Sequence, residues 1–170
     1  MPQVTQIRAV QPSDLATIRH TRTDWDIARE TIGRAFPITP ANEQRWYESL
    51  GEGHFPLSAV WTITADEDED AIGLVQITEI DWVHRTGWFG IWIAPTAQGH
   101  GHGTRATELA LAFAHHRMNL RQVRLRVVAD NHRAIATYAR TGWAEEGRLE
   151  GAVLEGGDTR DLILMRHDAR

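Results

Sequence analysis

The stretch "WFGIWIAPTAQGHGHGTRATELALAFAHH", residues 88–116, constrains the fold more than any other part of the chain. Its first part is rich in aromatic and β-branched residues, which favour a strand. In its last part apolar residues recur at helical spacing, so one face of a helix is expected to pack on a sheet. Only a short segment with three glycines separates the two. A strand that leads through such a loop into a helix predicts an α/β fold.

The glycine segment "QGHGHG", residues 98–103, allows three interpretations. A metal site at His100 and His102 lacks a third ligand close in sequence, so no metal is predicted. A flexible linker is disfavoured, because both flanks are well patterned. A loop that binds phosphate has a physical mechanism: glycines let a ligand approach the backbone N–H groups, and the start of a helix adds unpaired N–H groups and the positive end of its dipole. We therefore predict a pyrophosphate site here.

The remaining pattern predicts the order β-α-α-β-β-β-α-β-α-β-β. A mixed, mostly antiparallel sheet flanked by about four helices, in one domain over residues 1–170, is expected. Ser13 is the predicted cap of the first helix, and the acidic segment 66–70 is predicted to be a hairpin tip rather than a cation site. The predicted strands are 4–10, 58–64, 71–81, 88–95, 122–129, 143–154 and 159–167, and the predicted helices are 12–30, 40–50, 103–118 and 131–141.

Composition excludes several classes of protein. The chain has no cysteine, which excludes disulfides and thiolate metal sites and favours a reducing compartment. No apolar run reaches the length of a membrane span, and the N-terminus does not resemble a signal peptide. The formal net charge of −5 argues against a nucleic-acid partner. A cytoplasmic protein that binds neither membrane nor nucleic acid is predicted.

Two motifs resemble those of the GNAT acetyltransferase family. Gln98-x-x-Gly101-x-Gly103 is similar to the coenzyme A loop of that family, and "DNHRAIATYARTGW", residues 130–143, is similar to its Asn-x-x-Ala…Tyr-x-x-x-Gly segment, with Trp143 in place of the common Phe. The resemblance covers roughly residues 4–166. Residues 71–101 and 143–165 further resemble the branch that holds bacterial spermidine/spermine and ribosomal-protein N-terminal acetyltransferases. The stretch 32–40 has no acidic residue where the polyamine enzymes carry an acidic allosteric loop, so no such regulatory site is expected.

The resemblance implies acetyl-CoA as the co-substrate and direct transfer in a ternary complex. It makes Tyr138 the proton donor to the coenzyme A thiolate and Asn131 both a helix cap and a ligand of the pantetheine arm. An amide N–H of Trp92 or Ile93 is expected to polarise the thioester carbonyl. The cofactor-binding residues that it implies are Ile91, Trp92, Ile93, Gln98, Gly99, His100, Gly101, His102, Gly103, Thr104 and Asn131.

The acceptor amine must lose a proton before it attacks. An aliphatic amine of pKa about 10 is roughly 0.1% neutral at pH 7, so a base is needed. Glu79 is the candidate base or ammonium anchor, because strand alternation places it on the face of Val75 and Ile77, and the resemblance puts the matching acid of polyamine enzymes at the substrate site.

Other residues near Glu79 are further candidates for the acceptor site. Asp81 is a second candidate and His84 a third, while Trp82 and Trp88 are expected to line the acceptor cleft, where an aromatic face attracts an ammonium group. A polyamine-type small molecule is the leading acceptor, with a protein N-terminus or an amine antibiotic as alternatives. A non-catalytic acyl-CoA-binding module is the alternative of another class, and a longer acyl donor is also open. A homodimer is expected.

Overall fold

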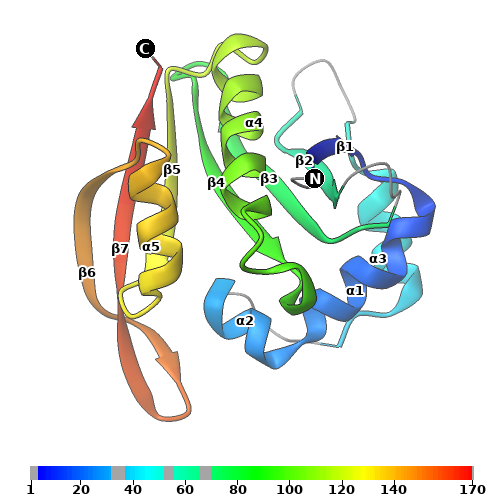
Figure 1. Cartoon of the computed structure of the whole chain (residues 1–170), viewed down its shortest axis with the longest axis horizontal. Coiled ribbons are helices and arrows are strands. Elements are labelled where there is room, and N and C mark those ends of the chain that lie inside the picture. Colours follow the sequence, from blue (N-terminus) through cyan, green and yellow to red (C-terminus); the bar gives the residue numbers. More distant parts are fainter. Residues whose placement is uncertain (1–3, 32–36, 52–55, 66–69, 170) are drawn as a thin grey trace.

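The chain folds around a seven-stranded sheet of order β1-β2-β3-β4-β5-β7-β6. In this computed structural model, residues 4–31, 37–51, 56–65 and 70–169 are described (Figure 1). Neighbouring strands are antiparallel except for the parallel pair β4 and β5, which confirms the predicted α/β class and mixed sheet. The strands are β1 (Thr5–Ala9), β2 (Ala59–Ala65), β3 (Gly73–Asp81), β4 (Thr86–Ile93), β5 (Gln122–Val128), β6 (Ala144–Glu155) and β7 (Asp158–Asp168).

The helices differ from the prediction mainly near the N-terminus. The helix expected over 12–30 is instead a short 3₁₀ helix (Pro12–Asp14), α1 (Leu15–Thr23) and α2 (Trp25–Thr31). Asp24 adopts extended backbone between α1 and α2, and its carboxylate accepts a hydrogen bond of 3.0 Å from the Ile27 N–H. The predicted cap at Ser13 is wrong: Ser13 lies inside the 3₁₀ helix, and the Asp14 carboxylate accepts from the Gln11 N–H at 2.8 Å. The other helices are α3 (Pro40–Glu48), α4 (His102–His116) and α5 (His132–Arg140).

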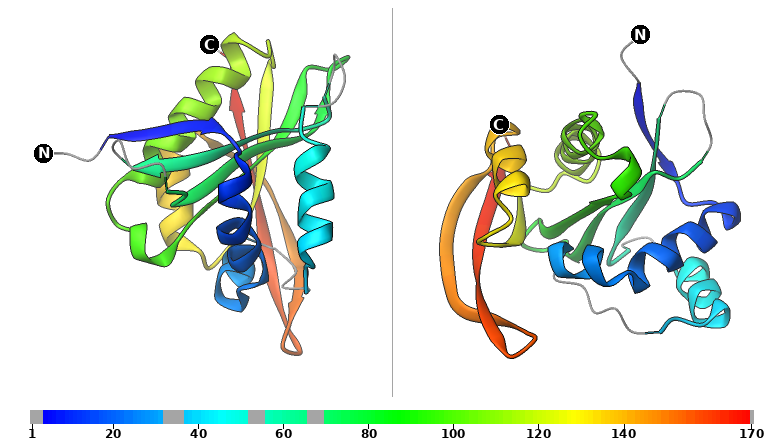
Figure 2. Two further views of the ribbon diagram at one scale, coloured as in Figure 1. Left: turned by 90° about the vertical axis from the view of Figure 1, so that its right-hand side faces the viewer. Right: turned by 60° about the horizontal axis from the view of Figure 1, so that its bottom comes forward.

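The two faces of the sheet carry separate cores. Val75 and Ile77 of β3 pack under α4, together with residues of β5 and α5. Leu74 of β3 packs on the opposite face with Ile18 of α1 and Trp46 of α3. Figure 2 shows α4 and α5 on one side of the sheet and α1 and α3 on the other. Alternation along β3 therefore assigns neighbouring side chains to opposite layers.

The sheet opens between its two central strands. β4 and β5 pair over three residue pairs only, from Thr86 with Gln122 to Trp88 with Arg124. Beyond Trp88 the edge of β4 that faces β5 therefore has no strand partner, and its backbone N–H and C=O groups need another partner or solvent. β5 continues to pair with β7 over its whole length. The opening is the place where the fold leaves room for an extended ligand.

Parts of two predictions lie outside the described residues. These are residues 66–69 of the predicted hairpin tip and residues 32–36 of the stretch without acidic residues. None of the helices that the structure describes is long and apolar enough to cross a membrane.

Candidate active site

A pocket of about 590 Å³ lies where β4 and β5 diverge. Its volume is within the usual range for small-molecule and cofactor sites. β4, the glycine loop, the first turns of α4, α5 and α2 all contribute to its walls. Ile91, Trp92 and Ile93, whose backbone was predicted to pair with the cofactor, all line the pocket. The Ile93 carbonyl faces the open edge of β4, whereas the Ala94 N–H bonds to the Ile72 carbonyl beside β3. By alternation, Ile91 and Ile93 present their backbone groups to the open edge, and the backbone of Trp92 faces β3, so that part of the prediction is wrong.

The glycine loop forms one end of this pocket. Gly99 and Gly101 have φ angles of 82° and 85°, a left-handed conformation that glycine adopts at little cost. Gly101 is the N-cap of α4 and has no side chain to cap it, so the start of the helix, with the positive end of its dipole, borders the pocket. Seven residues of this loop were predicted to bind the cofactor, and all but His100 line the pocket. The six that do are Gln98, Gly99, Gly101, His102, Gly103 and Thr104.

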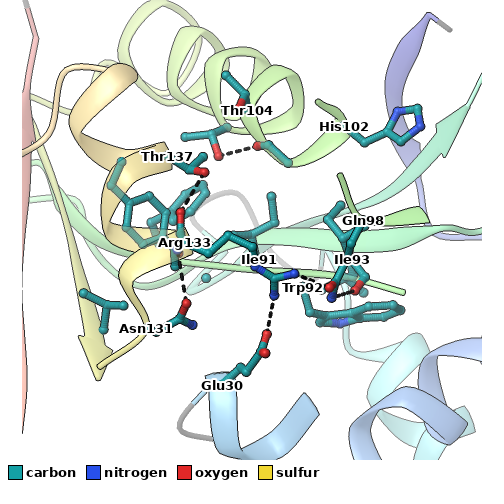
Figure 3. Close-up of a pocket in the computed structure, with 18 of the residues that line it drawn as sticks. Glu30, Ile91, Trp92, Ile93, Gln98, His102, Thr104, Asn131, Arg133 and Thr137 are labelled. Carbon is teal, nitrogen blue, oxygen red and sulfur yellow. Dashed lines mark hydrogen bonds and ion pairs between the residues drawn. The ribbon is translucent and has the colours of Figure 1, made fainter. Parts of the chain in front are cut away.

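The ring of His102 anchors the loop to the sheet. It is 2% exposed, and its Nδ1 lies 2.9 Å from the hydroxyl of Thr5 on β1. Figure 3 shows this ring turned away from the pocket towards β1. Among the described residues no group of three or more His, Cys, Asp or Glu side chains is placed to hold a metal ion. His102 can therefore contribute its backbone N–H to the pocket while its ring fixes the loop.

Tyr138 of α5 lies at the inner wall of the pocket. It is 8% exposed and packs edge-on against Phe89 of β4, with ring centroids 6.2 Å apart, and also against Trp143. Burial raises the pKa of Tyr138 to about 12, so the hydroxyl keeps its proton over the neutral range. Asn131 begins α5, where its side-chain oxygen accepts a 3.1 Å hydrogen bond from the Ala134 N–H, and it also lines the pocket.

A polar bridge crosses the pocket near the glycine loop. Arg133 of α5 donates to the carboxylate of Glu30 on α2 at 2.6 Å and also donates to the Gln98 side-chain oxygen. The Gln98 amide group in turn donates to the Ile93 carbonyl at 3.0 Å (Figure 3). The sequence did not single out Glu30 or Arg133. Arg133 lies two residues after Asn131 within the GNAT-like segment 130–143, so that motif could have indicated it, whereas Glu30 lies in no motif.

The predicted acceptor residues do not line the pocket. The expectation that Glu79 shares a face with Val75 and Ile77 is wrong, because the register of β3 and β4 shifts between Thr78 and Asp81. Glu79 has a φ of 49° and is exposed, whereas Val75 and Ile77 are buried. A β-bulge of this kind re-aims the side chains that follow it.

The other acceptor candidates have partners of their own. The carboxylate of Asp81 accepts from the backbone N–H of His84 and lies 2.8 Å from its Nδ1, and these hydrogen bonds lower the pKa of Asp81. The indole N–H of Trp82 donates to the Pro56 carbonyl at 3.0 Å. Trp88 carries the guanidinium of Arg126 over its ring at 4.0 Å, and Arg126 itself lines the pocket.

The pocket is predominantly cationic. Its charged lining consists of Arg22, Arg126, Arg133, Arg140 and, among the described residues, a single carboxylate from Glu30. Such a surface attracts a polyanion and suits the phosphates of a coenzyme. A glycine loop at the start of a helix, an open strand edge and a tyrosine that keeps its proton are features that suit an extended phosphorylated thioester.

A model of the family described as the acetyltransferase (GNAT) domain matches residues 5–144. The chain belongs to the GNAT acetyltransferase family. A spermidine N(1)-acetyltransferase of Escherichia coli strain K12 is 38% identical over 130 residues, which cover 71% of this chain and 70% of that enzyme. The Vibrio cholerae spermidine N(1)-acetyltransferase is 33% identical over 103 residues, covering 61% of this chain and 60% of that enzyme.

The fold agrees with a solved structure of this GNAT branch. A crystal structure of spermidine N-acetyltransferase from Vibrio cholerae, in complex with CoA and spermine, superposes with a TM-score of 0.88 at 26% identity and covers 96% of this chain and 95% of that chain. As a GNAT enzyme, the protein is an acetyl-CoA-dependent N-acetyltransferase. The family resemblance and the coenzyme expected from the sequence are confirmed.

Proposed function

We propose that this GNAT enzyme acetylates a primary amine of a polyamine-type small molecule, by direct transfer within a ternary complex. The observation that carries the reaction is the buried, protonated Tyr138 beside the open edge of β4 and in the same pocket as the glycine loop. The polyamine class is supported by the relatives, which are spermidine N-acetyltransferases.

The coenzyme would occupy the opening between β4 and β5. Its pantetheine amides pair with the backbone of Ile91 and Ile93, which face the open edge, in the manner of an added strand. Its pyrophosphate lies against the N–H groups of the glycine loop and of the first turn of α4. Asn131 holds the pantetheine arm at the start of α5. This arrangement brings the thioester towards Tyr138.

Acetyl transfer then follows from the positions of these groups. The neutral amine attacks the thioester carbon, and the amide N–H of Ile93 stabilises the oxyanion that forms. When the C–S bond breaks, Tyr138 donates its proton to the departing sulfur. The proton that the amine loses finally replaces the proton of Tyr138, so the products are the amide and the free thiol.

Deprotonation of the acceptor is assigned to Glu79. At pH 7 the deprotonation of an aliphatic ammonium costs about 4 kcal/mol, which a base recovers in part. Because Glu79 does not line the pocket, we propose that it acts through a chain of water molecules rather than by direct contact.

The test is release of free thiol from acetyl-CoA in the presence of spermidine, spermine, N-terminal peptides or aminoglycosides. Turnover of a polyamine, lost in Tyr138→Phe, supports the proposal. Turnover of peptides alone moves the protein to the N-terminal acetyltransferases. No release with any amine, despite tight coenzyme A binding, contradicts catalysis and favours a non-catalytic acyl-CoA-binding module.

Two finer expectations accompany this function. A homodimer is proposed, and the exposed Leu149 and Leu154 on the edge strand β6 offer apolar surface for it. Light scattering after gel filtration tests the mass in solution. The cytoplasmic location stays a prediction.

A further inference from the structure

The acceptor proposal raises a problem of charge in the pocket. A polyamine brings one or more ammonium groups besides the one that reacts, and each loses hydration when it is enclosed. Four arginines line the pocket, and Glu30 supplies the single carboxylate among the described lining residues. Glu79 and Asp81 do not line it. A polycationic acceptor that enters this pocket therefore has Glu30 as its available counter-charge.

Glu30 already has a partner in the structure. Its carboxylate lies 2.6 Å from Arg133 Nη2, and both side chains are about half exposed, 50% for Glu30 and 55% for Arg133. Ion pairs as exposed as this one contribute roughly 0–1 kcal/mol, so the pair is easily exchanged for another.

Arg133 is also placed for a second partner. Its other terminal nitrogen, Nη1, donates to Gln98, the first residue of the glycine loop that we assign to the pyrophosphate. A phosphate binds a guanidinium through two parallel charge-assisted hydrogen bonds, which are stronger than an exposed ion pair. Coenzyme binding thus competes with Glu30 for Arg133.

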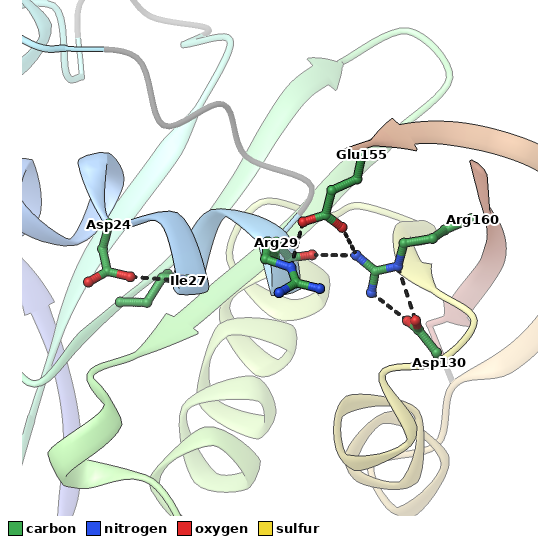
Figure 4. A network of polar contacts seen from close by, with 6 residues as sticks. All are labelled: Asp24, Ile27, Arg29, Asp130, Glu155 and Arg160. Carbon is green, nitrogen blue, oxygen red and sulfur yellow. Dashed lines mark hydrogen bonds and ion pairs between the residues drawn. The ribbon is translucent and has the colours of Figure 1, made fainter. Parts of the chain in front are cut away.

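The helix α2, which carries Glu30, is held in place by contacts that do not involve Arg133. The neighbouring Arg29 lies 2.5 Å from the Glu155 carboxylate, and its carbonyl accepts from Arg160 at 3.3 Å. Arg160 also binds Asp130 in the connection before α5 (Figure 4). The helix that carries Glu30 is therefore tied to the β6–β7 hairpin and to the start of α5, independently of Arg133.

We propose that Glu30 binds an ammonium group of the acceptor other than the one acetylated, and that the coenzyme makes Glu30 available by drawing Arg133 onto its phosphates. The inference rests on the proposed function, since it requires an acceptor with more than one ammonium group. It predicts ordered binding, with acetyl-CoA before the polyamine. Glu30 thereby selects polyamines over monoamines, and Arg133 links that selection to the bound coenzyme.

The test compares Glu30→Gln with wild type on two acceptors. With spermidine, the variant is expected to raise KM about tenfold at nearly unchanged kcat, because one charge-assisted hydrogen bond is lost. With butylamine, which has no second ammonium group, KM is expected to stay within twofold. Coenzyme A titrated without acceptor is expected to bind about two- to fivefold more tightly, because Arg133 no longer has a competing carboxylate.

Glu108→Gln is the matched control, since Glu108 forms an exposed ion pair of 3.1 Å with Arg105 and does not line the pocket. It should change none of the three quantities. Equal losses on spermidine and butylamine, weaker coenzyme A binding, or an unchanged KM for spermidine in Glu30→Gln would each overturn the inference. Absence of polyamine turnover by the wild-type enzyme would instead contradict the proposed function, and the coenzyme A titration would still test the exchange at Arg133.

Discussion

At the scale of single residues, Tyr138 carries the central prediction of mechanism. Tyr138→Phe removes one hydroxyl from a buried ring that packs on Phe89 and Trp143. General acid catalysis contributes typically 10²–10⁴-fold, so kcat should fall by about that factor. Steady-state kinetics measure this fall, and a coenzyme A titration should give an unchanged Kd. A kcat within threefold of wild type would mean that the thiolate leaves without this proton.

The buried hydroxyl of Tyr138 also makes stability depend on pH. Its pKa is raised to about 12, above the ordinary value of 10.0, so its contribution to folding is complete below pH 10 and is lost as pH rises towards 12. The free energy of unfolding of the wild type should therefore fall more steeply over that interval than that of Tyr138→Phe. Urea unfolding at a series of pH values measures both slopes, and parallel slopes would refute the assignment.

Glu79 gives a prediction about the pH dependence of the rate. If it accepts the proton of the ammonium group through water, Glu79→Gln lowers kcat/KM for spermidine about tenfold at pH 7. The deficit should shrink as pH approaches 10, because more of the amine is then neutral without a base. Rates from pH 6.5 to 10 provide the check, with Glu108→Gln as the control. A deficit that does not change with pH would point to a structural role.

At the scale of elements, two glycines at the start of α4 are expected to respond differently to substitution by alanine. Gly101 has positive φ and an open surrounding, so Gly101→Ala should cost about 1 kcal/mol of stability through backbone strain and weaken coenzyme binding. Gly103 lies in α4, where an added Cβ would meet Ile93 at an ordinary 3.7 Å, so Gly103→Ala should not destabilise the fold. Chemical unfolding with and without coenzyme A compares the two variants. Equal stability losses would contradict this distinction.

Element by element, the sequence was most informative where a pattern is local. The strand–loop–helix unit around residues 88–116 and the Asn131 cap follow from spacing and turn chemistry, and both were predicted. The break between α1 and α2 at Asp24 and the bulge at Glu79 were not predicted. The first depends on a hydrogen bond to Ile27 and the second on a register shift against β4, and neither leaves a periodic pattern in the sequence. Glu30 and Arg133 are 103 positions apart in the sequence, and only the fold brings them into contact.

At the scale of the whole molecule, Arg160 joins parts that are distant in sequence. It binds Glu155, Asp130 and the carbonyl of Arg29, while hydrogen bonds to these carboxylates raise its pKa. Arg160→Gln should lower the free energy of unfolding by about 1–3 kcal/mol, since charge-assisted hydrogen bonds are lost. Thermal unfolding measures the loss, and saturating coenzyme A should recover part of it. An unchanged Tm would show that the hairpin and α2 are held by other contacts.

The short pairing of β4 with β5, over three residue pairs, links the stability of the enzyme to its ligand. In the proposed binding mode, an extended thioester beside β4 would supply the hydrogen bonds that a neighbouring strand otherwise makes, so the ligand would complete the sheet. Binding to the folded state alone adds RT ln(1 + [L]/Kd), about 2.7 kcal/mol at a hundredfold excess over Kd. With the coenzyme bound in this way, resistance to unfolding and proteolysis would rise with the concentration of acetyl-CoA.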